Sequence, residues 1–305
     1  MKKRNFENDD KVNNYEETVM VERNYKDTVF RMLFNDKEKL LELYNAVNNT
    51  HYTNADDLKI NTLQNAVYMN MKNDVSCVFQ FYLNIYEHQS TNNPNMPLRN
   101  LFYVAKLLQR ELTEDKNLHS LYSSKLIKIP KPRFVVFYNG IDADLPDKTI
   151  YKLSDSFIES TNDPELELIV TVLNINIGKN KELLEQCKTL NDYCKYVDCI
   201  RKFSQEMSIE EAVNKAVDYC IKSNILADFL KKNKAEVISM SITECNYEEE
   251  IKKLRLIERE EGSKLRLLEQ VKKKLIKGKN IELIAAELEQ PVIIIQKCID
   301  EMNNK

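Results

Sequence analysis

Two carboxylates and an amide stand within a stretch that is otherwise rich in apolar and aromatic residues. Asp74 opens this stretch, and Glu87 and Gln89 stand near its end. If residues 81–89 form a strand, alternate side chains point to opposite faces, so Glu87 and Gln89 share the more apolar face. A carboxylate there is costly to desolvate unless it is paired or binds a metal. The alternative is that Glu87 and Gln89 lie past the strand end, where the face meets solvent.

The stretch divides into two strands, residues 74–80 and 82–89, although no Gly, Asn or Pro marks a turn between them. If the strands are neighbours, Asp74 lies beside Glu87, and two such carboxylates repel unless a proton or cation lies between them. A hard cation such as Mg²⁺, or Mn²⁺ in its place, takes oxygen ligands and can activate a bound water for attack on a phosphodiester. Gln89 is then placed to orient that water or the phosphate. We expect the His88 side chain to pack on the opposite face, which leaves its backbone carbonyl as a further metal ligand.

Composition excludes several classes of protein. The chain has 305 residues, of which 43% are hydrophobic, and a net charge of −3, so it can build a core and has no global footprint for nucleic acid. Its four glycines are isolated, which argues against a phosphate-binding loop and a nucleotide cofactor. Seven cysteines without a CxxC pair and three histidines make no zinc motif. We expect mostly buried thiols in a reducing compartment, no membrane segment and a cytoplasmic location.

Apolar spacing predicts helices at residues 27–34, 37–47 and 94–112, and strands at residues 133–140 and 166–178. Asn35 or Asp36 is expected to cap the second helix, and one or two short strands are expected within residues 50–70. The third helix should bury a stripe of six apolar residues: Leu98, Leu101, Phe102, Ala105, Leu108 and Leu112. This order predicts an α/β layered domain.

From about residue 180 the sequence favours helix, with a break near residues 223–224. We therefore expect a polar leader at residues 1–22, an α/β domain at 23–185 and a helical region at 186–305. Residues 250–279 hold eleven Lys or Arg against five Glu, which suits a solvated helix face, phosphate contact or oligomerisation. Two final helices around Gln290 and Pro291 have the spacing of a helix-turn-helix, but any helical hairpin with a proline turn has the same pattern.

Residues 71–107 closely resemble a family signature, and they read MKNDVSCVFQFYLNIYEHQSTNNPNMPLRNLFYVAKL. The family is that of the bacterial recombination-promoting nucleases and transposases, within the PD-(D/E)XK nuclease superfamily. The resemblance begins at DTVFRMLF, continues through EHQST, NPNMPLR and FVVFYNG, and covers about the first 180 residues. It implies a PD-(D/E)XK restriction-endonuclease-like core of helix, three strands, helix and strand, followed here by a helical C-terminal region.

The resemblance also implies a metal-dependent DNA endonuclease associated with recombination or mobile elements. Its catalytic acids match Asp74 and Glu87, and Gln89 stands where the superfamily usually has lysine. An early acidic helix position matches Asp27.

Glutamine carries no charge for a phosphate, so Lys72, Lys106 or Arg99 would have to supply it. We favour Arg99, whose fork grips a phosphate in two places; the alternative is a salt bridge on the helix surface. A non-catalytic DNA-binding or assembly protein is the rival function. A homo-oligomer is left open, since a dimer with two sites cuts both strands more easily.

Overall fold

The computed structural model describes residues 28–62, 74–114, 121–140 and 145–303. The chain divides into two compact units, Met1–Cys245 and Asn246–Lys305, which are described separately. In the described part of the chain, no helix is both long enough and apolar enough to cross a membrane.

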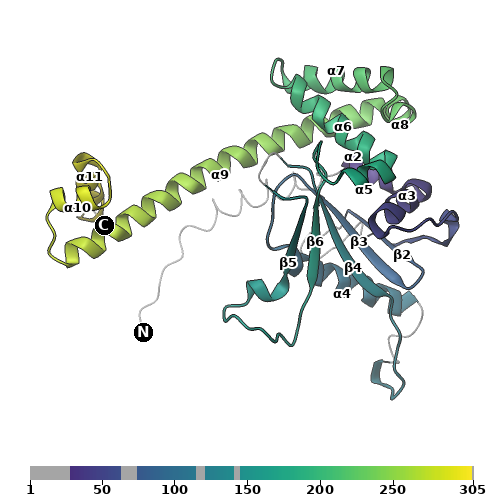
Figure 1. The fold of residues 1–305 in the computed structure, drawn as a ribbon, viewed down its shortest axis with the longest axis horizontal. Coiled ribbons are helices and arrows are strands. Elements are labelled where there is room, and N and C mark those ends of the chain that lie inside the picture. The colour runs from purple at the N-terminus through teal and green to yellow at the C-terminus, as the bar shows by residue number, and fades with distance from the viewer. Residues whose placement is uncertain (1–27, 63–73, 115–120, 141–144, 304–305) are drawn as a thin grey trace, which may run out of the picture. The chain divides into compact units, whose positions relative to one another are not determined.

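The first unit is built on one mixed six-stranded sheet (Figure 1). Its strand order is β1-β2-β3-β4-β6-β5. The three central strands β3, β4 and β6 run parallel, while β1, β2 and β5 join them in antiparallel fashion. The strands are β1 (Lys59–Ile60), β2 (Val75–Phe79), β3 (Tyr82–Gln89), β4 (Lys131–Tyr138), β5 (Lys148–Lys152) and β6 (Ile169–Asn174).

Strands β2 and β3 form a hairpin, which confirms the two predicted strands. Phe79 pairs with Tyr82, so the connection consists of Gln80 and Phe81. The turn contains no Gly, Asn or Pro, and Gln80 itself adopts the left-handed backbone with φ of 55°. This conformation is strained for a residue with a Cβ atom.

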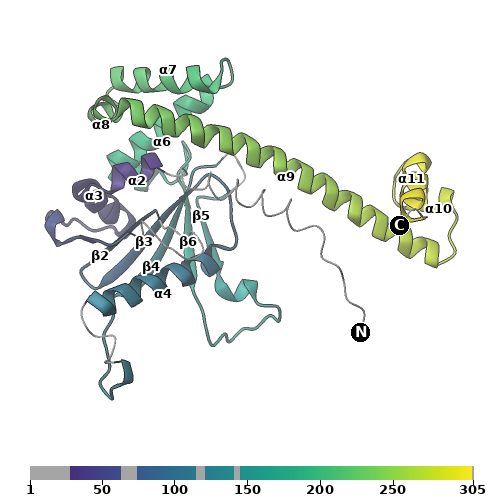
Figure 2. The same cartoon turned by 180° about the vertical axis from the view of Figure 1, so that it is seen from behind.

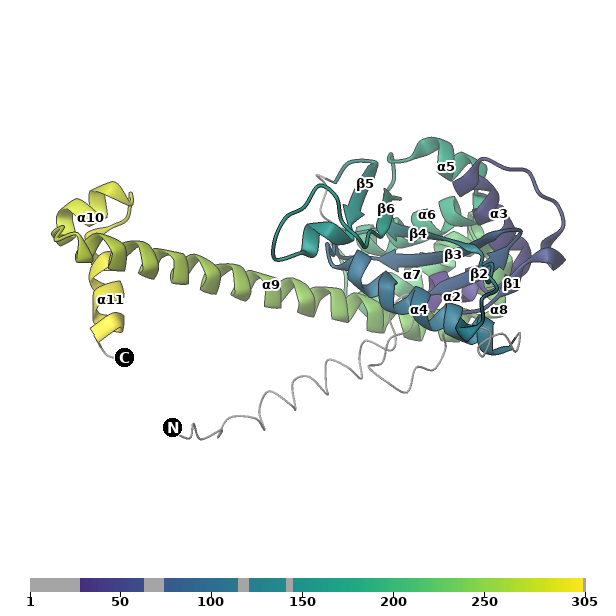
Figure 3. The same cartoon turned by 90° about the horizontal axis from the view of Figure 1, so that it is seen from below.

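Helix α4 (Met96–Glu114) covers one face of the sheet, called here the α4 face (Figure 3). It packs on apolar side chains of β3, β4 and β6. The predicted buried stripe is only partly correct, because Leu101 and Leu108 pack against this core whereas Leu98 and Phe102 are 41% and 40% exposed. The buried side of α4 instead carries Met96, Pro97, Asn100, Tyr103, Val104 and Leu107. Counting apolar residues alone misplaced the centre of the buried side, because that side includes a tyrosine and an asparagine.

The other α-helices of this unit, with the first part of α9 (Lys234–Ile276), build the core on the opposite face of the sheet, the side away from α4 in Figure 2. Asp36 caps α3 (Lys37–Asn48) by accepting a hydrogen bond from the Lys39 N–H at 3.1 Å, as predicted. Ser208 and Glu211 form a capping box at the start of α7. Besides α9, these helices are α2 (Thr28–Phe34), α3 (Lys37–Asn48), α5 (Lys181–Gln186), α6 (Lys188–Phe203), α7 (Ile209–Lys222) and α8 (Ala227–Lys232). Two short 3-10 helices, η2 (Ala55–Asp57) and η4 (Leu153–Ser156), lie elsewhere in this unit.

The fold is therefore a mixed α/β protein with a six-stranded mixed sheet and a helical C-terminal region. The predicted order of helices and strands is confirmed, as are the break between α7 and α8 and the burial of most cysteine thiols. Strand β5 was not identified from the sequence. It is a five-residue edge strand with lysine at both ends, and its pairing with β6 defines it.

The second unit contains the end of α9 (Lys234–Ile276), with α10 (Ile281–Glu287) and α11 (Val292–Asn303). The predicted terminal helical pair is thus present. Its small core is formed by Val271, Ile284, Ala285, Ile295 and Cys298. Lys274 and Lys279 both pair with Glu287, and their hydrogen bonds and positive charges lower the pKa of that carboxyl to about 2.

Gln80→Gly should stabilise the first unit, because glycine adopts the left-handed turn without a Cβ clash. We expect a gain of about 0.5–1 kcal/mol in the free energy of unfolding, measured by urea denaturation. Gln80→Ala is the control, since alanine keeps the Cβ atom and should give no gain. An equal gain in both variants would contradict a backbone origin.

The sequence predicts a domain boundary after residue 185, and truncation of the chain tests this prediction. The core that contains β2 also contains side chains from α6 and α7, among them Tyr193, Tyr196 and Val217. We therefore expect a chain that ends at residue 245 to keep a cooperative thermal transition, and a chain that ends at residue 185 to lose it. A cooperative transition in the shorter chain would instead support the boundary at 185.

Candidate functional site

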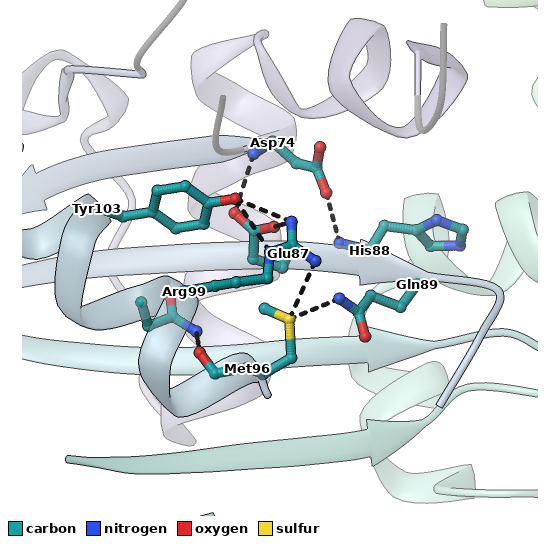
Figure 4. A network of polar contacts seen from close by, with 8 residues as sticks. Asp74, Glu87, His88, Gln89, Met96, Arg99 and Tyr103 are labelled. Atoms are coloured by element: carbon teal, nitrogen blue, oxygen red, sulfur yellow. Dashed lines mark hydrogen bonds and ion pairs between the residues drawn. The ribbon is translucent and has the colours of Figure 1, made fainter. Parts of the chain in front are cut away.

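Asp74 and Glu87 lie side by side at one end of the β2–β3 hairpin. Val75 pairs with Tyr86, so Asp74, which directly precedes β2, stands opposite Glu87. The Asp74 N–H donates a hydrogen bond to Glu87 Oε1 at 3.2 Å, and the His88 N–H donates one to Asp74 Oδ2 at 2.8 Å (Figure 4). The backbone N–H of Asp74 thus binds the Glu87 carboxylate, and the backbone N–H of His88, next to Glu87, binds the Asp74 carboxylate.

Glu87 is buried within β3 and does not lie beyond its end. The strand continues to Gln89, and the Glu87 residue is 2% exposed. Leu83 and Ile85, four and two residues earlier, lie in the core under α4, so Glu87 belongs to the α4 face as strand parity predicts. The alternative in which this acid meets solvent past the strand end is wrong. A carboxylate in this position requires compensating partners.

Arg99, in the first part of α4, supplies the compensating positive charge. Its Nη2 atom lies 3.5 Å from Glu87 Oε2. Its Nε and Nη2 atoms donate to the Tyr103 hydroxyl oxygen at 3.3 and 2.8 Å. Arg99 therefore pairs with the acid of β3, in contrast to the alternative of a salt bridge on its own helix surface.

The ionisation of both α4 residues reflects this arrangement. Burial disfavours the charged guanidinium, but the negative charge of Glu87, with smaller contributions from Tyr103 and Asp74, raises the pKa of Arg99 above its ordinary value. Burial first, and then the Glu87 charge, raises the pKa of the Tyr103 hydroxyl well above its ordinary value. At neutral pH the site thus holds a charged guanidinium and a neutral phenol.

Gln89 lies at the end of β3 beside Arg99 and Met96, which brings all three predicted catalytic residues together (Figure 4). With its Nε2 toward Met96, the amide contacts the sulfur at 2.6 Å. With the amide turned over, Oε1 accepts a hydrogen bond from Arg99 Nη1 at 3.0 Å and Nε2 donates to the Thr91 carbonyl at 3.2 Å. The second orientation satisfies both polar atoms of the amide.

The His88 ring lies on the other face, as strand parity predicts. Its Nε2 atom is 3.1 Å from the Tyr193 hydroxyl of α6, and the ring stacks on Phe30 at 5.3 Å between centroids. The His88 N–H points to Asp74, and in an extended strand the carbonyl of the same residue points the same way. The backbone carbonyl thus faces the side of β3 on which Asp74 lies, and its role as a metal ligand stays a prediction.

The carboxyl ends of β3, β4 and β6 lie at the same end of the sheet, because these strands are parallel. Arg201 of α6 links the segments that follow β4 and β6 at this end, since its Nη1 donates to Asn139 Oδ1 at 2.9 Å and to Asn176 Oδ1 at 3.2 Å. Gly140 lies so close to the segment after β3 that an added Cβ would stand 2.2 Å from the Ser90 carbonyl oxygen. The end of the FVVFYNG segment therefore fixes the strand end that carries Gln89.

Sequence reasoning missed Tyr103, Tyr193 and Arg201. Tyr103 had a usable signal, because it stands four residues after Arg99 on one helix. Tyr193 and Arg201 had none, since their helix meets the strand end through tertiary packing. Among the sequence candidates, Lys106 lies two turns beyond Arg99 on α4, while Asp27 and Lys72 fall outside the described residues.

The donors fit a hard cation better than zinc. In the described ranges no group of three or more His, Cys, Asp or Glu side chains could hold a metal. Two carboxylates and a backbone carbonyl are oxygen donors, and Mg²⁺ binds through one or two carboxylates while it keeps several waters. Zinc sites need three or four nitrogen, sulfur or carboxylate ligands from the protein.

Comparisons of the chain with protein-family models, curated proteins and solved structures found no match. The family resemblance of residues 71–107 accordingly stays a prediction.

The C-terminal helical pair presents a second, weaker candidate surface. A helix-turn-helix reads bases with the first residues of its second helix, which here would be α11. Val292 and Ile293 at that position are 48% and 67% exposed. Exposed valine and isoleucine lack the hydrogen-bonding groups that discriminate bases, so this surface is better suited to contact with protein.

Tyr103→Phe should lower stability modestly, because the hydroxyl accepts two hydrogen bonds from Arg99. The Arg99 side chain is 39% exposed, so water replaces part of the loss. We expect a decrease of about 1 kcal/mol in the free energy of unfolding, measured by urea denaturation. Tyr122→Phe, at a tyrosine that is 94% exposed, is the control and should have no effect.

Proposed function

We propose that the protein is a metal-dependent DNA endonuclease that hydrolyses phosphodiester bonds. The observation that carries the proposal is the buried Glu87 carboxylate, held beside Asp74 and faced by Arg99 and Gln89. Two adjacent acids at a strand end, with a cationic fork next to them, suit a divalent cation and a phosphate. The order α3, β1 to β3, α4 and β4 agrees with the helix, three strands, helix and strand of a PD-(D/E)XK core and supports that finer assignment.

Each residue has a distinct part in the proposed reaction. Asp74 and Glu87 would hold Mg²⁺ or Mn²⁺ together with the His88 carbonyl, and the bound cation would supply a water of lowered pKa and neutralise phosphate charge. Gln89 orients the water or a phosphate oxygen by hydrogen bonding. Arg99 provides the positive charge that Gln89 lacks, since the Gln89 oxygen lies 3.0 Å from its Nη1 atom. Asp27 is retained as a further acidic residue of the site on the resemblance alone.

The proposed partner is DNA, and the biological setting suggested by the resemblance is recombination or mobile elements. The excess of Lys and Arg over Glu in residues 250–279 gives the second unit charge to contact phosphates. A homo-oligomer would bring two sites to the two DNA strands.

A non-catalytic DNA-binding or assembly protein is the second candidate function. The exposed apolar residues at the start of α11 favour its assembly form over base reading. Filter binding to duplex DNA across salt concentrations separates the candidates. Binding that falls steeply with salt, without cation-dependent cleavage, would support the non-catalytic protein.

Asp74→Asn and Glu87→Gln keep the shapes of the side chains but remove their charges. With supercoiled plasmid and Mg²⁺ or Mn²⁺, we expect each change to reduce nicking at least about a hundredfold. Filter binding of DNA should persist or improve, because a negative charge near the phosphate path is removed. Asp56→Asn, at an acid whose side chain is 95% exposed, is the matched control and should nick at the wild-type rate.

The two variants should differ in stability without metal. Glu87→Gln leaves Arg99 without its carboxylate partner and should lower the melting temperature, whereas Asp74→Asn keeps that ion pair and should have little effect. Nicking by both variants at the wild-type rate would contradict the proposed catalytic role of Asp74 and Glu87.

A further inference from the structure

The charge of Arg99 is engaged by the same carboxylate that the proposed cation needs. Arg99 Nη2 lies 3.5 Å from Glu87 Oε2, and Asp74 is linked to Glu87 through its backbone N–H. Glu87 is almost fully buried, so a positive charge must stay near it whether or not a cation is bound. A guanidinium and a divalent cation both meet that requirement, and each weakens the attraction of the site for the other.

Arg99 is also held by groups that do not depend on the Glu87 charge. Its shortest contact, at 2.8 Å, is with the neutral Tyr103 hydroxyl. The 3.5 Å separation from Glu87 is longer than a charge-assisted hydrogen bond of about 2.7–2.9 Å. With its amide turned over, Gln89 accepts a third hydrogen bond from the guanidinium. The fork can therefore lose its contact with Glu87 and still be held at the site.

We propose that Arg99 is an internal counter-ion for Asp74 and Glu87, which stabilises the site without metal and competes with the catalytic cation for Glu87. This inference rests on the proposed cation site. It gives Arg99 two states. Paired with Glu87, its charge is used within the protein. Released from Glu87 and held by Tyr103 and Gln89, its fork is available to a DNA phosphate.

The sign of the effect on cation binding distinguishes this role from a merely structural one. Removal of a structural contact loosens a site and weakens its ligands. Removal of a competing positive charge instead raises the negative potential at the carboxylates and strengthens cation binding. Because the Arg99 side chain is 39% exposed and solvent screens part of its field, we expect about a tenfold change in affinity.

The test is calorimetric titration of Mn²⁺ into the full chain without DNA, with melting temperatures in EDTA and in Mn²⁺ as a second readout. Arg99→Gln should bind Mn²⁺ about tenfold more tightly than the wild type, melt at a lower temperature in EDTA and gain more on adding Mn²⁺. Arg99→Met, which fills similar apolar volume, should do the same and serves if the glutamine variant does not fold. Arg99→Lys keeps the charge and should stay close to wild-type affinity.

Arg110→Gln is the matched control on the same helix. Arg110 lies eleven residues after Arg99, about 16 Å further along α4, so its removal should leave Mn²⁺ affinity unchanged. Unchanged or weaker binding by both charge-removing variants, in a wild type that binds Mn²⁺, would overturn the counter-ion role and leave the cation site intact. Absence of binding in the wild type and every variant would overturn the cation site, and the inference with it. Loss of binding in Asp74→Asn verifies that the measured heat comes from this site.

Discussion

A buried carboxylate on the apolar face of a central strand is the constraint on which the site depends. Glu87 sits in β3 with apolar side chains before it on the same face. Leaving it uncompensated would be strongly unfavourable, so the surrounding structure must supply hydrogen bonds and positive charge. The Asp74 N–H supplies the hydrogen bond and the Arg99 guanidinium supplies the charge. Proteins seldom keep such a group unless it has a task, because an apolar residue would pack there more favourably.

The two layers of helices serve this strand end in different ways. On the α4 face, Arg99 and Tyr103 contact the carboxylate and one another. On the opposite face, the His88 ring meets Tyr193 and Phe30 in the main core. Because neighbouring residues of a strand alternate between faces, anchoring His88 on one side aligns Glu87 and Gln89 on the other. The His88 N–H that holds Asp74 belongs to the same anchored residue. The main core thus helps to position the site on the α4 face.

The arrangement around Arg99 also accounts for a glutamine at position 89, where the resemblance to PD-(D/E)XK nucleases leads one to expect lysine. A lysine at position 89 would bring its own charge to the acids. Here that charge arrives from α4, and Gln89 contributes a neutral acceptor that steers the guanidinium. The positive charge of Arg99 therefore lies on α4, whereas the acid Glu87 lies on β3. In the proposed reaction, the Arg99 charge would move between the acid and a substrate without any change in the backbone.

Much of the first unit could be predicted from the sequence because its signals are local. Alternation in residues 81–89 placed Glu87 and Gln89 on one face and His88 on the other, and spacing and caps located most of the helices. Those patterns depend on the geometry of a single strand or helix. Strand β5 and the buried side of α4 were beyond this reasoning. An edge strand is defined by its neighbour, and the buried side of a helix is decided by what lies beneath it.

The residues by themselves determined which groups were available: two acids at hairpin spacing, an amide two positions after the second acid, and an arginine on the next helix. Tertiary structure alone decided how they combine. The β2–β3 register set Asp74 opposite Glu87, and the rotation of α4 aimed Arg99 at Glu87. The packing of α6 brought Tyr193 and Arg201 to the strand end. These contacts join residues that are distant along the chain, and their energies depend on burial, which becomes defined only when the layers have packed.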